Sequence, residues 1–323
     1  MKLQLLTILI GCVTIQAAWA DRLVTDSTGR DVQIPDHPSR IVVLHEPLLG
    51  VPLMDLGLAP IGSYGRTDEG ESLMSVDFFQ EIFGARGPKP NGVGALGNLD
   101  LEKLHALQPD LIIGTEHDSD KANRLSAIAP VYLQNSSTGL VRGFSPEKNL
   151  ADVVNLSDAF EQRRAEYQQR LMTVKAKLPT YEHQPTYLGL FLTDQVNALG
   201  EMSGAAQAME DLGFQRLSFQ DKNDRSGLGS TLIVPVSSEV VGQLNPDVLI
   251  ILNSYNETDR SPQQTQASLD RILPGWKQFL APAKEGRILY LDSGKVTTPS
   301  VASAEWTLAE LEAWLDNQPN KKH

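Results

Sequence analysis

Residues 145 to 179 carry the longest periodic pattern of apolar positions in the chain. The apolar residues recur at helical spacing, with charged and amide side chains between them: Leu150, Val153, Val154, Phe160, Tyr167, Leu171, Val174 and Leu178. Ser145 suits a helix cap, Pro146 suits the first helical position, and Pro179 ends the run. The pattern predicts a long amphipathic helix, broken near residues 155 to 158.

Two matching units flank this helix, at residues 101 to 113 and 238 to 251. Each begins with a glutamate, Glu102 or Glu239, followed after six residues by Pro-Asp and then by an unbroken apolar run. A short helix halted before proline and a wholly apolar strand are typical of parallel sheets covered on both faces. The repeat predicts two similar lobes joined by the long helix.

Strands and helices alternate on both sides of the predicted linking helix. Further strands are predicted at 40–44, 60–64, 131–133, 186–192, 197–199 and 287–291, and further helices at 119–128, 204–212, 269–280 and 300–315. A small hairpin is predicted within residues 23 to 34. This alternation predicts an α/β fold with two lobes, each holding a central and mostly parallel sheet.

Residues 68 to 98 are rich in glycine and proline, and only one helix, at 75–83, is predicted there. The segment Gly92-Val93-Gly94-Ala95-Leu96-Gly97 formally matches a dinucleotide-binding fingerprint. That motif requires a preceding strand, whereas Pro88-Lys89-Pro90-Asn91 stands in its place. We expect a loop and no nucleotide cofactor.

The N-terminal residues 1–20 have the layout of a secretory signal peptide. Lys2 is followed by an apolar run, and Ala18-Trp19-Ala20 stands before Asp21 as a cleavage site. The apolar run is too short to span a membrane. We expect cleavage after Ala20. Cys12 follows Leu9-Ile10-Gly11, so lipid attachment at Cys12 is the alternative, although the apolar run before it is short for a signal peptide.

The composition narrows the classes of function. Cys12 is the only cysteine, so the mature chain can form no disulfide or cysteine metal site. Without the signal peptide, 27 basic groups stand against 40 acidic groups, a net charge of −13, and no basic run occurs. Nucleic acid is therefore not an expected partner. A mature chain of about 300 residues suits two domains.

Candidate functional residues follow the predicted strands, because ligands of open parallel sheets lie outside the carboxyl ends of the strands. These positions, with one arginine from a polar loop, give the expected ligand contacts: His45, Glu46, Tyr64, Arg66, Glu116, His117, Met202, Arg225, Asn253, Tyr255 and Thr297. The arginines and tyrosines suit an anionic or aromatic ligand.

Two other interpretations of these residues stay open. The pairs His45-Glu46 and Glu116-His117 have the chemistry to surround a metal ion directly, although loop histidines and acids are mostly solvated. The same carboxylates and imidazoles have the chemistry of an acid and base in a secreted enzyme. However, the chain contains no GxSxG, HExxH or Walker motif. We favour an organic ligand without catalysis.

The chain resembles the periplasmic substrate-binding proteins of ABC importers for iron siderophores, haem and cobalamin. The resemblance covers nearly the whole mature chain in order. It is carried by Asp26-Ser27-Thr28-Gly29-Arg30-Asp31-Val32, Pro38-Ser39-Arg40-Ile41-Val42-Val43-Leu44, Asp55-Leu56-Gly57-Leu58-Ala59-Pro60-Ile61-Gly62, residues 98–113, Ile128-Ala129-Pro130-Val131, Glu210-Asp211-Leu212-Gly213-Phe214 and Gly286-Arg287-Ile288-Leu289-Tyr290-Leu291.

The resemblance implies an N-terminal lobe at 21–145, a linking helix at 146–179 and a C-terminal lobe at 180–323. It also implies a shallow ligand cleft between the lobes, with only small closure on binding. It further implies a non-enzymatic, monomeric protein of the periplasm that captures a ferric siderophore or related iron chelate. The partner would be an inner-membrane permease dimer with its ATPase, whose arginines would receive Glu102 and Glu239. The ligand stays open among catecholate, hydroxamate, carboxylate, haem and cobalamin.

Overall fold

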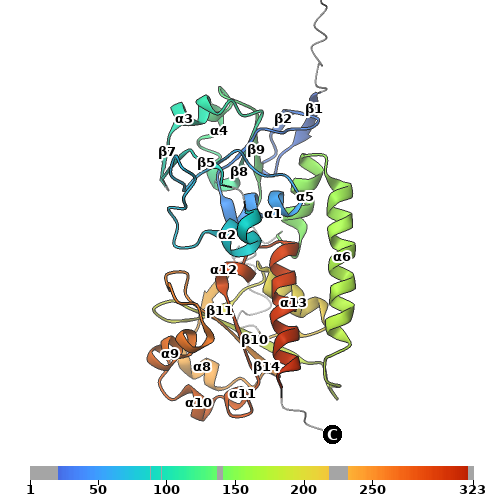
Figure 1. Ribbon diagram of the computed structural model, residues 1–323, viewed down its shortest axis with the longest axis vertical. Helices are drawn as coiled ribbons and strands as arrows, with labels where there is room; N and C mark the ends of the chain where they lie inside the picture. Colours follow the sequence, from blue (N-terminus) through green and yellow to red (C-terminus); the bar gives the residue numbers. More distant parts are fainter. Residues whose placement is uncertain (1–20, 88, 96, 137–140, 218–231, 319–323) are drawn as a thin grey trace, which may run out of the picture.

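The N-terminal lobe is built on a five-stranded parallel sheet with the order β5-β4-β3-β8-β9 (Figure 1). The computed structural model describes residues 21–87, 89–95, 97–136, 141–217 and 232–318. The strands are β3 Ile41–Val43, β4 Gly62–Ser63, β5 Asn91–Gly92, β8 Leu111–Thr115 and β9 Val131–Gln134. The helices are α1 Val51–Asp55, α2 Phe78–Phe83, α3 Leu101–Ala106 and α4 Ala122–Leu125, and the hairpins are β1 Asp21–Thr25 with β2 Asp31–Pro35 and β6 Gly94–Ala95 with β7 Asn98–Leu99.

The C-terminal lobe holds a second, mixed sheet. Its order is β13-β11-β10-β14-β15, with β12 also pairing with β10. Strands β10, β12, β14 and β15 pair in parallel, whereas β11 pairs antiparallel with both β10 and β13. The strands are β10 Thr186–Leu192, β11 Val196–Leu199, β12 Gln215–Arg216, β13 Ile233–Pro235, β14 Val248–Leu252 and β15 Ile288–Leu291. The helices are α7 Gly204–Asp211, α8 Ser238–Gly242, α9 Pro262–Ile272, α10 Trp276–Phe279, α11 Ala281–Lys284, α12 Ser293–Val296 and α13 Val301–Asp316. The predicted α/β class with two mostly parallel sheets is confirmed.

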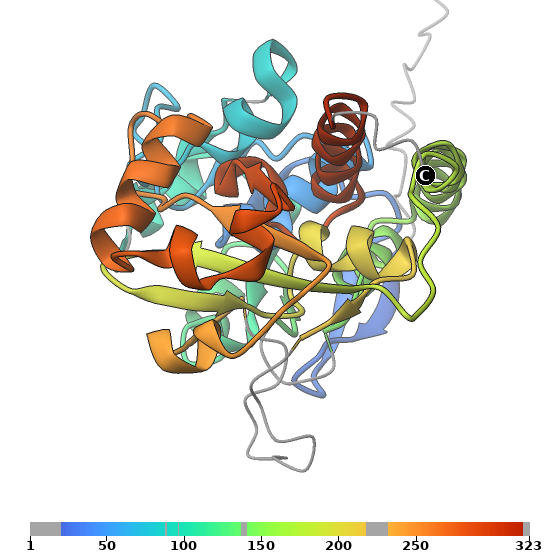
Figure 2. The same ribbon diagram turned by 90° about the horizontal axis from the view of Figure 1, so that it is seen from below.

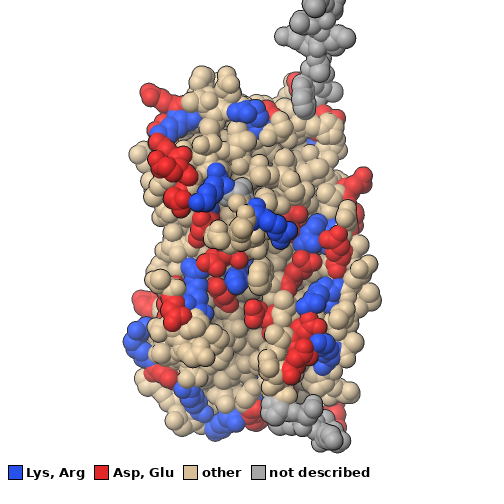
Figure 3. Space-filling view, viewed as in Figure 1, with Lys and Arg blue, Asp and Glu red and all other residues tan. Residues whose placement is uncertain are grey.

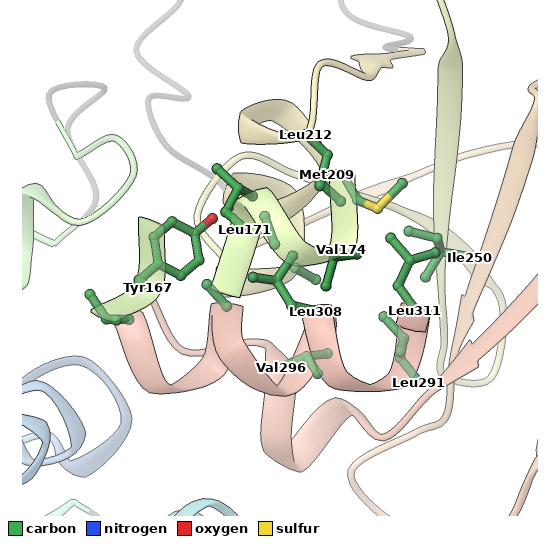
Figure 4. Packing of buried hydrophobic residues seen from close by; sticks show 14 of the residues in the cluster. Tyr167, Leu171, Val174, Met209, Leu212, Ile250, Leu291, Val296, Leu308 and Leu311 are labelled. Carbon is green, nitrogen blue, oxygen red and sulfur yellow. The ribbon is translucent and has the colours of Figure 1, made fainter. Parts of the chain in front are cut away.

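The predicted linking helix is two helices, α5 Ser145–Val153 and α6 Ser157–Lys175. Asn155 lies between them with φ of 58°, a left-handed conformation that interrupts an α-helix. Leu150 and Val153 of α5 pack into the core of the N-terminal lobe. Leu171 and Val174 of α6 pack into the core of the C-terminal lobe, beside Leu308 of α13 (Figure 4). The expected break is confirmed, and each half of the segment serves a different lobe.

Among the predicted segments whose bounds differ from the structure, two show a clear physical reason. A helix was expected from residue 269, but α9 begins at Pro262 because the Ser261 side chain accepts the Gln264 N–H and proline suits the first helical turn. The loop expected around Gly92 contains the short strands β5 and β6. A Cβ on Gly92 would lie 2.0 Å from the Arg66 carbonyl oxygen, so the close backbone approach requires glycine. Within the described residues, no helix has the length and apolarity to cross a membrane.

The N-terminus of α13 receives carboxylates from the N-terminal lobe and the linking segment. The Val301 N–H donates to Glu147 Oε2 at 2.8 Å, and the Ala302 N–H donates to Asp55 Oδ2 at 2.7 Å. Arg163 of α6 donates to Asp55 Oδ1 at 3.0 Å. Helices α6 and α13 lie side by side in both views (Figures 1 and 2). These contacts join α1, α5, α6 and α13 in one buried cluster, which we call the carboxylate clamp.

The clamp favours the protonated form of Glu147. This side chain is fully buried, and its Oε1 accepts no hydrogen bond. Burial, and secondarily the neighbouring Asp55 carboxylate, raise the pKa of Glu147 well above its usual range. Burial also raises the pKa of Asp55, but Arg163 opposes that shift. We therefore place the proton on Glu147, where it can bond to Asp55.

Substitution of Glu147 by glutamine tests this protonation state. Glutamine keeps the acceptor for the Val301 N–H and supplies permanent N–H donors in place of the proton. A raised folded-state pKa stabilises the protein fully below the unfolded-state pKa, and this stability is lost as the pH rises toward the folded-state pKa. We expect Glu147→Gln to exceed the wild type in free energy of unfolding by about 1 kcal/mol or more at pH 8, and to match it near pH 4.

Urea denaturation across that pH range measures the difference. Glu161→Gln is the matched control, because Glu161 is an exposed glutamate of α6. Equal slopes of stability against pH in wild type and Glu147→Gln would show that Glu147 is ionised in the folded protein.

Candidate functional site

A pocket with a volume of about 570 Å³ lies between the two lobes. Its lining residues come from both sides of the molecule: His45, Pro47, Leu48, Leu73, Met74, Ser75, Val76, Phe78, Phe191, Thr193, Met202, Leu232, Ser254, Tyr255, Asn256, Thr297 and Thr298. A volume in this range, with mostly apolar walls and a few polar groups, is typical of small-molecule binding sites.

The sheets position the pocket. His45 follows β3, Thr193 follows β10, Ser254 follows β14, and Thr297 follows α12 beyond β15. These strands run parallel within their own sheets, so their carboxyl ends share one edge. The pocket therefore lies where the topology of an open parallel sheet predicts a ligand.

Three aromatic side chains form a contact across the two lobes at this pocket. The Tyr255 ring meets the edge of Phe78 of α2 at 5.6 Å between centroids and that of Phe191 of β10 at 5.0 Å. The hydroxyls of Tyr255 and Thr297 lie 2.6 Å apart, and Thr297 donates to the Ser293 carbonyl. Burial raises the pKa of Tyr255 to about 12, so its hydroxyl stays neutral at physiological pH.

His45 presents a neutral imidazole to the pocket. Its Nδ1 accepts the Leu48 N–H at 3.3 Å, which caps the π-helical turn Glu46–Gly50. The surrounding protein withdraws water from the ring and lowers the pKa of His45, and Asp118 opposes this shift. With Nδ1 as acceptor, the neutral ring carries its proton on Nε2.

Glu46 and Arg66, both expected to contact ligand, are instead bound to each other beneath the surface. Arg66 Nε and Nη2 donate to the two carboxylate oxygens of Glu46, each at 2.6 Å, and both side chains are fully buried. Arg66 also donates to Asp77 and to the Gly70 carbonyl. The pair fixes the loop from Gly70 to Asp77, which carries pocket residues. Neither Glu46 nor Arg66 lines the pocket.

The other expected contacts are divided between the pocket and its surroundings. Met202, Tyr255 and Thr297 line the pocket together with His45. Asn253 is buried, and its Oδ1 accepts the Ser293 N–H, so it positions the next residue, Ser254, without lining the pocket. Arg225 lies outside the described residues.

Tyr64, Glu116 and His117 also lie away from the pocket lining. Tyr64 packs against the core of the N-terminal lobe. Glu116 Oε2 accepts the N–H and hydroxyl of Ser136, each at 2.8 Å, and His117 is exposed beside Glu116. Of the four residues considered for direct metal binding, Glu46 is held by Arg66, whereas Glu116 and His117 lie near enough to His45 to affect its pKa. No group of three or more His, Cys, Asp or Glu among the described residues is arranged to hold a metal ion.

Several pocket residues were missed by the sequence reasoning. Met74, Val76 and Phe78 belong to the irregular segment 68–98, which crosses to the cleft only because the Arg66 ion pairs fold it back. The apolar spacing at Val76, Phe78 and Phe79 signalled a helix but gave no sign of which side faces a ligand.

The fold and site define a two-lobed binding protein, and comparison with known proteins gives its family. Residues 79–294 match the family described as "Periplasmic binding protein", and the chain belongs to that family. The chain is 24% identical over 273 residues to the Fe(3+)-citrate-binding protein YfmC of Bacillus subtilis, covering 84% of this chain and 78% of the relative. It is 21% identical to the ferric-anguibactin-binding protein FatB of Vibrio anguillarum, covering 69% of each.

Solved structures share the same fold. The FhuD protein from S. pseudintermedius superposes with a TM-score of 0.69 at 18% identity, covering 93% of this chain and 99% of that one. Staphylococcus aureus SirA, complexed with staphyloferrin B, gives a TM-score of 0.66 at 18% identity, covering 91% and 98%. At these identities the likeness concerns the fold alone.

Replacement of Arg66 by methionine tests its structural role. The substitution leaves the Glu46 carboxylate buried without its cation, and we expect a loss of about 3–5 kcal/mol in the free energy of unfolding. The double variant Glu46→Gln with Arg66→Met should lose less than the sum of the two single changes. Urea denaturation measures all three variants.

Lys89→Met is the control, because Lys89 forms an exposed ion pair with Glu71 and its loss should cost less than about 1 kcal/mol. An Arg66→Met protein with wild-type stability would contradict the structural assignment and restore Arg66 as a candidate ligand contact.

Proposed function

We propose that this protein is the solute-binding component of an ABC importer, which captures a ferric siderophore or related iron chelate in the interlobe pocket and delivers it to an inner-membrane permease. The pocket at the carboxyl ends of both sheets carries this proposal. Its volume accommodates an organic chelate far better than a bare ion. Relatives and fold neighbours with ferric chelates in their names support the same ligand class.

The organisation of the chain fits this function. We propose that residues 1–20 are removed as a signal peptide, that residues 21–145 and 180–323 act as the two lobes, and that residues 146–179 link them. The family membership supports a periplasmic location. The break at Asn155 supports the linker, because α5 packs with one lobe and α6 with the other.

A catalytic role finds little support in the geometry. Glu46, the carboxylate next to His45, forms an ion pair with Arg66. Burial raises the pKa of Glu46, and Arg66 opposes that shift. Glu116 accepts bonds from Ser136. Neither carboxylate lines the pocket, whereas a general acid or base must reach the substrate. Binding without catalysis is the function that we propose.

Titration of intrinsic fluorescence tests the ligand class. The ligands are ferric siderophores of different donor types, ferric citrate, haem, cobalamin and free divalent metal ions. We expect saturable binding of at least one ferric chelate, because the pocket is large and apolar. Trp306, which packs on the cluster containing Val76 and Phe78, is placed to report it.

Two outcomes would contradict the proposal. Absence of binding by every chelate would remove its main support. Tight binding of a free metal ion, abolished by His45→Ala with His117→Ala, would favour direct metal capture instead.

Glu102 and Glu239 occupy equivalent positions in the two lobes. Each is exposed and is the second residue of a short helix, α3 or α8, capped by Asp100 or Ser237. Nearby backbone and Ser237 donors lower the pKa of Glu239, so this carboxylate stays charged. We propose that the two side chains pair with arginines of a two-fold permease, one from each lobe.

Charge reversal of both residues tests the docking proposal. The double variant Glu102→Arg with Glu239→Arg should bind ligand as the wild type does, because neither side chain lines the pocket. Its melting temperature should fall only slightly, since a helix-start carboxylate contributes about 0.3–1 kcal/mol. Iron uptake by cells that depend on this protein should be abolished, because like charges would meet at both contacts.

The matched control reverses Glu161 and Glu310, which are exposed on α6 and α13 and change the net charge equally. Normal uptake by the Glu102/Glu239 variant would leave these residues with a role in helix initiation only.

A further inference from the structure

The described lining of the interlobe pocket contains no lysine, arginine, aspartate or glutamate. Its walls are mainly apolar, with Leu48, Met74 and Phe78 on one lobe and Phe191 and Met202 on the other. A site that removes an anion from water needs cationic or hydrogen-bonding partners to offset the lost hydration. These walls offer no such cation to a highly charged ligand.

The arginines near the pocket are already paired. Arg66 is fully buried between Glu46 and Asp77. Arg260 lies in the adjoining hollow, where its Nη1 contacts Glu81 at 2.8 Å and Asp292 at 3.9 Å.

That adjoining hollow is acidic. Glu81, Glu257 and Asp292 line it with Arg260 as the only described cation, so its formal charge is −2. Lys295 lies over the Trp306 ring at 4.4 Å instead of entering the pocket lining. Outside the pocket, acidic and basic side chains alternate over the face in Figure 3 without a basic field. An anionic ligand would therefore approach an uncharged wall beside a negative one.

The polar groups of the lining are neutral. His45 has its Nδ1 occupied by the Leu48 N–H, so its Nε2–H is a donor and not a metal ligand in this geometry. Tyr255 and Thr297 add hydroxyls that bond to each other. A neutral N–H donor and hydroxyl groups can form hydrogen bonds with the carbonyl or hydroxamate oxygens of a chelate. In such a chelate the ferric ion already balances the negative charge of these oxygens.

We propose that this pocket selects ferric chelates of low net charge with an apolar periphery, such as neutral trihydroxamates, over polyanionic catecholate or carboxylate chelates. The inference rests on the proposed function as a chelate-binding protein and narrows its ligand class. The discrimination comes from desolvation, because a trianionic complex loses hydration that these walls do not replace.

The test compares two probes of similar size in fluorescence and calorimetric titrations of the whole mature protein. One is a neutral ferric trihydroxamate and the other is a trianionic ferric tricatecholate. We expect the neutral probe to bind at least about tenfold more tightly, which corresponds to ~1.4 kcal/mol.

A charge introduced into the pocket provides the second arm. Met202 is a half-buried lining residue on the connection after β11, so Met202→Lys adds a cation without disturbing the core. This variant should narrow or reverse the preference, whereas Met202→Gln, of similar size and uncharged, should retain it. Melting temperatures identify any variant that fails to fold, and the wild-type comparison alone still decides the inference.

The outcomes separate the two levels of the proposal. Tighter binding of the tricatecholate by the wild type would overturn the inference while leaving the chelate-binding function in place. An unchanged preference in a folded Met202→Lys protein would also count against selection by charge. Failure of both probes, and of every other ferric chelate, would overturn the proposed function itself.

Discussion

The buried contact between the N-terminus of α13 and two carboxylates fixes how the lobes sit relative to each other. Asp55 lies at the end of α1 in the N-terminal lobe and Glu147 lies in α5 of the linking segment, yet they accept hydrogen bonds from successive amides of α13. The amides at a helix start need acceptors, and the carboxylates need donors once they are buried. Arg163 offsets the charge of Asp55, and burial favours the protonated form of Glu147, so the cluster carries little unbalanced charge.

This constraint holds the two walls of the pocket in place. The same α13 that bonds to Glu147 also packs along α6, and it follows α12, next to the pocket residue Thr297. Across the cleft, Tyr255 contacts Phe78 of the other lobe. The two lobes therefore present a preformed apolar surface, and a ligand has little conformational rearrangement to drive. Its charge and shape, more than its ability to close the lobes, would decide its affinity.

Local patterns in the sequence were enough for the elements and for the class of fold. The two Pro-Asp units correctly predicted α3 followed by β8 and α8 followed by β14. The periodicity of residues 145–179 predicted α5 and α6, with the break at Asn155. The rule on strand ends located His45, Tyr255 and Thr297 at the pocket. The same rule wrongly placed Glu46 and Arg66 in the pocket lining, because these two residues, 20 positions apart, bind each other. Their pairing depends on how a glycine-rich segment folds back, and the hydrophobic periodicity of the sequence does not indicate that fold.

The contacts of the carboxylate clamp imply one fixed arrangement of the lobes, with the pocket already formed. Small-angle X-ray scattering of the protein, empty and saturated with the ferric chelate that it binds most tightly, tests this claim directly. A fixed arrangement predicts the same radius of gyration in both states, within experimental error. A clear decrease on ligand binding would show that the lobes close over the ligand and that the clamp does not hold them.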